Sequence, residues 1–150
     1  QDPFNYGTTT VASASTLRGT AALKLTGSGD YTIDEEITQT VSGGTAKGRV
    51  VSWDSTNGIL KYFQSPDLHT HNGKVLAFDH ATNNVTGATS STARPIDGNQ
   101  DTALADISFT DGKANPEIAP NSGDIVYIEN RRQITRAADQ IEDIKLVIEF

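Results

Sequence analysis

The C-terminal stretch from Ser122 to Phe150 constrains the fold of this chain most strongly. In its last seven residues every second side chain is apolar, which is the period of a β-strand with one apolar face. That face would carry Ile144, Leu146, Ile148 and Phe150. Because a terminal aromatic is costly to leave in water, we expect this end of the chain to be docked against other parts of the protein.

A second strand is predicted at the start of the same stretch. Residues 124–130, DIVYIEN, are apolar on both faces, which is typical of a strand in the centre of a sheet. The intervening residues 130–143 place Ile134, Ala137, Ala138 and Ile141 at helical spacing. One short helix is therefore possible between the two strands.

The remaining composition also favours strands. The chain is rich in Thr, Ser and Gly and has no long leucine-rich helical pattern. We therefore predict an all-β fold, an antiparallel sandwich or partly closed barrel with long loops and at most one short helix. There is no cysteine, which excludes disulfides, thiolate metal sites and a cysteine nucleophile, and which fits assembly in a reducing cytoplasm.

The domain organisation is predicted to be simple. Residues 1–150 suffice for one β-rich domain. Because the chain begins at Gln1 and contains no methionine, we interpret it as a fragment of a longer protein. Its parts would be an extended arm (1–15), a small β module (17–64) and a remainder that includes the C-terminal stretch (65–150).

Two internal segments carry specific expectations. Residues 47–64 read as a hairpin, with Asn57-Gly58 in the connection, where a positive φ is needed. Residues 79–103 contain few apolar side chains, and 25 residues without a core pattern is long for a compact domain. We expect that stretch to wrap a partner, form a functional loop or be mobile.

Charge and hydropathy exclude some partners. The net charge is −7, and the basic residues cluster only at Arg131, Arg132 and Arg136, so nucleic-acid binding is disfavoured. No apolar run approaches the roughly 20 residues of a membrane span, so we expect no membrane partner.

Metal sites have only weak signals. His69 and His71 are two residues apart, with Asp79 and His80 nearby, and could share a metal ion if they lay on one strand face. They fall in a polar loop, where a solvated histidine is the better interpretation. Residues 97–101, DGNQD, have the oxygen spacing of a calcium loop, but Thr102 and Ser108 replace its Gly and Glu, which favours a polar turn. We predict no metal and no cofactor.

Catalytic motifs are equally weak. Asp34, Glu35 and Glu36 could supply paired carboxylates, but sequence neighbours seldom face each other across a sugar, so we expect a solvated acidic corner. The chain has neither a Gly-x-Ser-x-Gly elbow nor a phosphate-binding loop. We predict that this protein is not an enzyme.

The C-terminal stretch resembles the end of a baseplate wedge protein of T-even-like contractile-tailed bacteriophages. The shared order is Tyr, Glu-Asn-Arg, Asp-Gln-x-Glu and a final apolar strand ending in Phe. Residues 38–64 look similar to versions in cyanophage relatives. The coliphage pattern has prolines after Glu-Asn-Arg, where this chain has Arg132 and Gln133, so the turn there differs. The signature positions are Tyr127, Glu129, Asn130, Arg131, Asp139, Gln140 and Glu142.

This resemblance implies a structural role in the virion. The chain would be a subunit of the tail baseplate wedge, assembled in the host cytoplasm, binding other wedge subunits and forming a homodimer in the full-length protein. The three arginines would then pair with nearby carboxylates inside the chain or across an interface. Without the resemblance, such pairs would be surface ion pairs worth less than about 1 kcal/mol.

One alternative from another class stays open. A carbohydrate- or receptor-binding β module of a phage tail would also be β-rich. It would expose aromatic side chains together on one face, and Trp53 and Tyr62 are the candidates.

Overall fold

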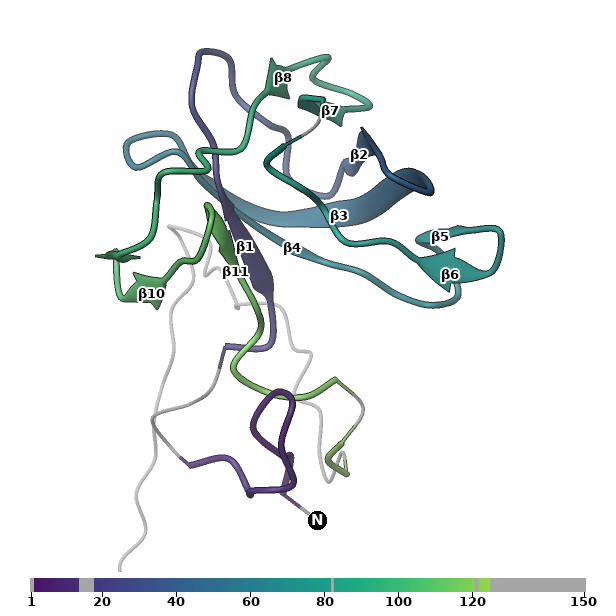
Figure 1. The fold of residues 1–150 in the computed structure, drawn as a ribbon, viewed down its shortest axis with the longest axis vertical. Helices are drawn as coiled ribbons and strands as arrows, with labels where there is room; N and C mark the ends of the chain where they lie inside the picture. Colours follow the sequence, from purple (N-terminus) through teal and green to yellow (C-terminus); the bar gives the residue numbers. More distant parts are fainter. Residues whose placement is uncertain (1, 14–17, 82, 121, 125–150) are drawn as a thin grey trace, which may run out of the picture.

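The computed structural model describes residues 2–13, 18–81, 83–120 and 122–124 (Figure 1). Within these ranges the regular structure is β-strand, with no helix. The longer strands are β1 (Ala21–Lys24), β2 (Glu36–Val41), β3 (Gly44–Asp54) and β4 (Ile59–Phe63). The shorter ones are β5 (Thr70–His71), β6 (Lys74–Val75), β7 (Val85–Gly87), β8 (Ala93–Arg94), β9 (Ala103–Leu104), β10 (Ile107–Ser108) and β11 (Lys113–Ala114).

Seven of these strands form one antiparallel sheet, in the order β11-β1-β4-β3-β2-β7-β8. The β5–β6 and β9–β10 hairpins are separate two-stranded sheets, and Figure 1 shows both projecting from the main sheet. The predicted β module (17–64) and the predicted remainder (65–150) both contribute strands to this sheet. The prediction of an all-β, antiparallel fold is confirmed.

The main sheet curls until the chain after β8 meets the chain after β1, the strand next to the β11 edge. Leu25, just after β1, forms a bridge with Ile96, which follows β8. On either side of that bridge, the Asp97 amide donates to the Lys24 carbonyl at 2.9 Å and the Thr26 amide donates to the Pro95 carbonyl at 3.1 Å. These bonds satisfy backbone groups that an open sheet would leave at its edge. The fold is thus a partly closed barrel.

The hairpin predicted for residues 47–64 is confirmed as β3 and β4. Its connection is fixed by Asp54, whose carboxylate accepts the amides of Thr56 at 3.0 Å and Asn57 at 3.2 Å. Gly58 then adopts a φ of +65°, which glycine reaches without steric cost. The pKa of Asp54 lies below its ordinary value, chiefly because the Asn57 side-chain amide donates to its carboxylate. The backbone amides of Asn57 and Thr56 add to this effect.

The expectation for residues 79–103 is wrong. Instead of one long irregular segment, this stretch supplies β7 and β8 to the main sheet. Val85 is fully buried, and Ile96, in the same stretch, is nearly so. Strands of three and two residues are too short to show a period of two, so their membership of the sheet depends on the pairing of β7 with β2 and of β8 with β7.

The two faces of β1 and β4 bury different cores. Leu23 and Leu60 point into the barrel, and both are fully buried. Their neighbours Ala22 and Ile59 lie on the opposite face, where residues from 104 to 114 cover them. The barrel core consists of Leu23, Leu25, Tyr31, Ile37, Ala46, Val50, Leu60, Tyr62, Phe78, Val85 and Ile96. The second cluster consists of Ala22, Ile59, Ile107, Phe109 and Ala114.

The predicted N-terminal arm is described over residues 2–13, which Figure 1 shows below the barrel in purple. It pairs with residues 117–122 rather than with the main sheet. Asn5 bridges Ile118, the Tyr6 amide donates to the Glu117 carbonyl at 2.8 Å, and the Ala119 amide donates to the Phe4 carbonyl at 2.8 Å. No residue of 2–13 is buried, so backbone hydrogen bonds hold this arm more than apolar packing does.

Among the described residues, no helix is long and apolar enough to cross a membrane.

Candidate docking hollows

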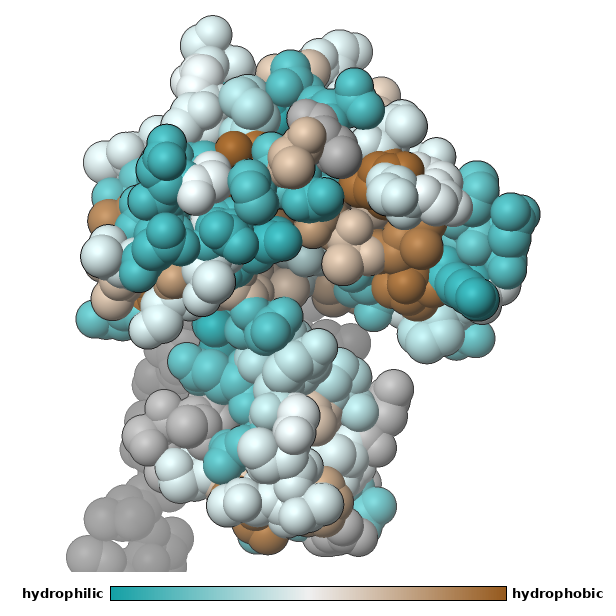
Figure 2. Space-filling model, in the orientation of Figure 1, coloured by the Kyte–Doolittle hydropathy of each residue, from teal (hydrophilic) through white to brown (hydrophobic). Residues whose placement is uncertain are grey.

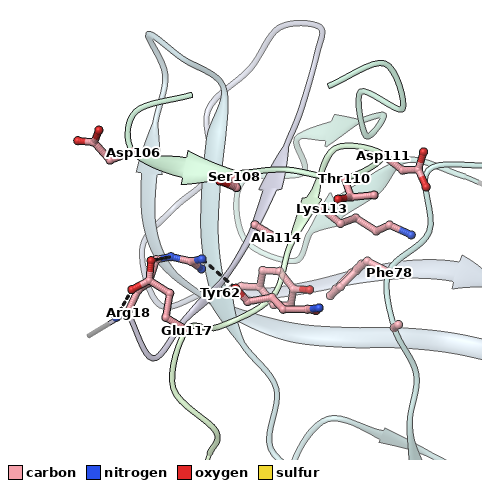
Figure 3. A pocket seen from close by; sticks show the side chains of 12 residues that line it. Arg18, Tyr62, Phe78, Asp106, Ser108, Thr110, Asp111, Lys113, Ala114 and Glu117 are labelled. Carbon is pink, nitrogen blue, oxygen red and sulfur yellow. Dashed lines mark hydrogen bonds and ion pairs between the residues drawn. The ribbon is translucent and has the colours of Figure 1, made fainter. Parts of the chain in front are cut away.

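Two neighbouring hollows lie where the barrel meets the arm, and both are lined by Tyr62, Ala77 and Asn115. The first, here called the apolar hollow, has a volume of about 670 Å³. It is also lined by Tyr6, Phe63, Pro66, Val75, Pro116 and Pro120. The second, here called the polar hollow, has a volume of about 640 Å³. It is also lined by Arg18, Asp106, Ser108, Asp111, Lys113 and Glu117 (Figure 3).

The apolar hollow exposes large apolar side chains from three separate segments. Phe63 ends β4, Val75 ends β6 and Tyr6 belongs to the arm, and their exposed fractions are 38%, 39% and 45%. Asp67 is the one charged residue among the described residues that line this hollow. Figure 2 shows hydrophobic surface gathered beside the β5–β6 hairpin. Apolar side chains grouped in this way are typical of a surface that another protein covers.

His69 holds the rim of the apolar hollow in place. Its Nδ1 accepts the Ser65 amide at 2.9 Å, and its own amide donates to the Ser65 carbonyl at 2.9 Å. The imidazole is almost fully buried and meets the Phe63 ring edge-on, with 5.4 Å between the ring centroids. Because Nδ1 accepts a hydrogen bond, the proton of the neutral ring lies on Nε2. Burial lowers the pKa of His69, since a charged ring would lose water here.

Gln64 completes the rim. Its side-chain amide donates to the Lys47 carbonyl at 2.7 Å and to the Leu76 carbonyl at 2.8 Å. One side chain thus ties the segment after β4 both to β3 and to the residue that follows β6. These two hydrogen bonds therefore fix the backbone next to Phe63 relative to the backbone next to Val75.

Arg18 and Glu117 organise the polar hollow, as Figure 3 shows. The guanidinium donates to the carbonyls of Thr20 and Asn115, the latter at 2.8 Å. Arg18 Nε lies 4.0 Å from Glu117 Oε1, while Glu117 Oε2 accepts the Arg18 backbone amide at 3.0 Å. Burial lowers the pKa of Arg18, and the Glu117 carboxylate partly opposes that effect. This pair joins the residues just before β1 to the segment after β11, with which the arm pairs through the Glu117 and Ala119 backbone.

The two hollows together suit a protein surface. One half is apolar and nearly uncharged, and the other carries both signs of charge on Arg18, Lys113, Asp106, Asp111 and Glu117. A nucleic-acid site would instead carry a predominantly positive surface. An apolar centre beside a mixed polar region is the usual composition of an interface between proteins.

The predicted signature residues cannot be placed in these hollows. Tyr127, Glu129, Asn130, Arg131, Asp139, Gln140 and Glu142 lie outside the described residues, as do Arg132 and Arg136. Their expected pairing and interface role stay predictions.

The three histidines lie in three different environments. His69 is buried, so the interpretation of a solvated loop histidine is wrong for it, because its ring fills the space beside Phe63. His71 lies on β5 against Gly44. His80 lies 3.6 Å from the Asp79 carboxylate. Among the described residues, no group of three or more His, Cys, Asp or Glu is arranged to hold a metal ion.

The calcium-like spacing of residues 97–101 forms a turn. The Asp97 carboxylate accepts the Asn99 amide at 3.2 Å, within its own turn. The Asp101 carboxylate accepts the amide of Asp111 at 2.7 Å, in another segment. These two carboxylates therefore bind backbone amides in different places.

The prediction of a solvated acidic corner is wrong at Glu35. Its side chain is only 4% exposed, and its two oxygens accept four hydrogen bonds from backbone and hydroxyl donors. The donors are the amides of Thr32 at 2.7 Å, Thr89 at 2.8 Å and Ser90 at 2.8 Å, and the Ser90 hydroxyl at 2.7 Å. The structure thus uses this carboxylate to fasten the loop after β7 to the turn before β2.

Trp53 and Tyr62 do not form an exposed aromatic face. Tyr62 is 7% exposed and meets Phe78 edge-on in the barrel core, and its burial raises its pKa. Trp53 is half-buried, donates from Nε1 to Asp30 at 2.8 Å, and lies under the Arg94 guanidinium at 4.7 Å. The observation that would favour a carbohydrate-binding module is therefore not met by these two residues.

Tyr6, Phe63 and Val75 were not predicted as site residues. Their hydrophobicity is visible in the sequence, but in a strand or arm it predicts burial rather than exposure. Three prolines, Pro66, Pro116 and Pro120, mark the connections around the apolar hollow and are the one local signal that could have located it.

Comparison with known proteins gives no relative: no family model, curated protein or solved structure matches this chain.

Proposed function

We propose that this chain is a virion structural protein, a subunit of a phage tail baseplate wedge, that works by protein–protein assembly. The observation that carries the assembly role is the apolar hollow, where Tyr6, Phe63 and Val75 are each more than a third exposed. The baseplate assignment is supported by the resemblance of residues 122–150 to the wedge proteins.

The occupant that we propose for the apolar hollow is a second copy of this chain. Two chains of net charge −7 repel each other, so contact between copies requires a surface with little charge. The apolar hollow is such a surface, since Asp67 is the one charged residue among its described lining residues. The homodimer expected from the resemblance would be built on it, and other wedge subunits would bind elsewhere.

Light scattering across a wide concentration series tests this contact. We expect the wild-type chain to dimerise and the Val75→Glu variant to dimerise at least about tenfold more weakly, because a carboxylate would be buried without a partner. Val51→Glu is the matched control: Val51 is also a strand valine, 41% exposed against 39% for Val75, but does not line the hollow. A wild-type monomer throughout, or equal weakening by both variants, would overturn the proposal.

The baseplate assignment needs a separate experiment. Antibodies against the chain, applied with gold labels to particles of the phage that encodes it, should mark the tail tip in electron micrographs. Labelling of the capsid alone, or of no intact particle, would contradict the assignment. Binding to a glycan array by a chain that stays monomeric would favour the carbohydrate-binding alternative instead.

A further inference from the structure

We propose that Asn72 is a site of spontaneous covalent modification, at which the side-chain amide is converted to aspartate and isoaspartate. The chain contains two Asn-Gly pairs, Asn57-Gly58 and Asn72-Gly73. In both, the small glycine leaves its backbone nitrogen accessible to the preceding asparagine side chain. The structure distinguishes the two pairs strongly.

The reaction is an intramolecular displacement. The Gly73 backbone nitrogen attacks Cγ of Asn72, a C–N bond forms, and the Cγ–Nδ2 bond breaks. The proton from the Gly73 nitrogen leaves with Nδ2 as ammonia, so the product is a five-membered succinimide. Water then opens either carbonyl of the ring, which gives aspartate or isoaspartate at position 72. No other co-reactant is needed.

Asn72 is held weakly. It and Gly73 form the two-residue turn between β5 and β6, with φ values of +49° and +75°, and both residues are exposed. Its side chain makes no hydrogen bond to any residue that the structure describes, and a Cβ placed on Gly73 would meet nothing within 4 Å. The hairpin has only two residue pairs, Thr70 with Val75 and His71 with Lys74. Opening this short hairpin to reach the reactive conformation should therefore cost little free energy.

Asn57 is held firmly by contrast. Its side-chain amide donates to Asp54 Oδ2 at 2.7 Å and its backbone amide to Asp54 Oδ1 at 3.2 Å. The Gly58 carbonyl accepts the Leu25 amide at 2.8 Å, and a Cβ on Gly58 would lie 2.5 Å from the Leu25 carbonyl oxygen. This turn joins β3 and β4 in the centre of the main sheet, so its opening requires disruption of the barrel.

The modification lies at an edge of the apolar hollow. Val75, which lines that hollow, is three residues from Asn72 and pairs across the hairpin with Thr70. Aspartate adds a negative charge to the turn, and isoaspartate also inserts an extra atom into the backbone path. An inserted backbone atom in a two-residue turn disturbs the register of the strands that it joins. The conversion would thus alter one wall of the hollow irreversibly as the protein ages.

Peptide mapping by mass spectrometry tests this inference on the intact chain. Samples are incubated at mildly alkaline pH, folded or in concentrated urea, and the conversion of each Asn-Gly pair is followed over time. In the folded protein we expect Asn72 to convert at least about tenfold faster than Asn57, because only its turn opens locally. In urea the two rates should approach each other, since the local sequences then differ little.

The Asn72→Gln variant is the control for the assignment, because its longer side chain cannot readily form the five-membered ring. It should remove the folded-state conversion without changing the circular dichroism spectrum. Two results would overturn the inference: equal conversion of Asn57 and Asn72 in the folded protein, or an intact Asn72 under conditions in which the unfolded chain reacts.

Discussion

Replacement of Glu35 by glutamine should destabilise the barrel, although the two side chains have nearly the same shape. Oε1 accepts the Thr32 amide and the Ser90 hydroxyl, and Oε2 accepts the amides of Thr89 and Ser90. Glutamine has one accepting oxygen, so its NH₂ group must face either the Thr32 amide or the amide pair. A buried donor then loses its acceptor.

The expected loss follows from these contacts. A buried unsatisfied donor costs about 1–3 kcal/mol, and hydrogen bonds to a charged group are worth about 1.5–3 kcal/mol each. Since glutamine can keep the two amides on one oxygen, we expect Glu35→Gln to lower the free energy of unfolding by about 3 kcal/mol. In urea unfolding, that loss should lower the midpoint by about 1.5 M for a slope of about 2 kcal/mol/M.

The pH dependence provides a second test of Glu35. Burial alone would raise the pKa of Glu35, but the hydrogen bonds from Ser90, Thr32 and Thr89 outweigh it and hold the pKa below its ordinary value of 4.5. A carboxylate with a lowered folded-state pKa stabilises the protein above the unfolded pKa, and that stabilisation disappears as the pH falls through the folded pKa. The wild type should therefore lose more stability below pH 4.5 than Glu35→Gln does.

Glu36→Gln is the matched control, since it removes the same charge from the adjacent, half-buried residue. We expect it to change the free energy of unfolding by less than about 0.5 kcal/mol. If Glu35→Gln were within about 1 kcal/mol of the wild type and had the same pH profile, the hydrogen bonds to this carboxylate would not contribute as argued.

Three further predictions concern the hollows and their supports. Arg18→Met should remove the hydrogen bonds to the Thr20 and Asn115 carbonyls, loosen the segment at Glu117 with which the arm pairs, speed proteolysis within residues 2–13 and cost about 1–3 kcal/mol. Arg49→Met, at an exposed ion pair, should cost under about 1 kcal/mol. Limited proteolysis and urea unfolding compare the two variants, and equal effects would refute this role of Arg18. Because burial lowers the pKa of His69, the folded state resists its protonation, so the free energy of unfolding should fall as the pH drops below the ordinary value of 6.5. His69→Phe should flatten that part of the pH profile. An unchanged profile in the variant would contradict this role of His69. Gly44→Ala should destabilise the protein more than Gly43→Ala. Both residues have positive φ, but only at Gly44 would a Cβ lie 2.2 Å from the His71 ring. Equal melting temperatures of the two variants would show that the ring moves aside freely.

Much of the fold was predictable from local pattern. The β3–β4 hairpin follows from two apolar runs around Asn57-Gly58, and the all-β class follows from composition. These features depend on residues within one segment, so the sequence carries them directly. The contribution of β7 and β8 was missed because strands of three and two residues have no readable period.

The candidate site was not predictable in the same way. Phe63 and Val75 are large apolar strand residues, a type that predicts burial, and they are exposed because the arm and the β5–β6 hairpin leave a hollow there. Equally, nothing local distinguishes Glu35 from Glu36, yet one is buried under four donors and the other is only half-buried. The donors at positions 89 and 90 lie more than fifty residues away in the sequence.

The sequence by itself determined the strand content, the tight hairpin turn and the low charge density of the apolar segments, because these depend on side-chain chemistry and short-range backbone geometry. The tertiary structure decided the closure of the barrel through Leu25 and Ile96, the burial of Glu35 and the different environments of two identical Asn-Gly pairs. Each of these outcomes depends on contacts between segments that are far apart in the sequence. The free energy of such contacts depends on the whole chain and cannot be read from any short stretch of it.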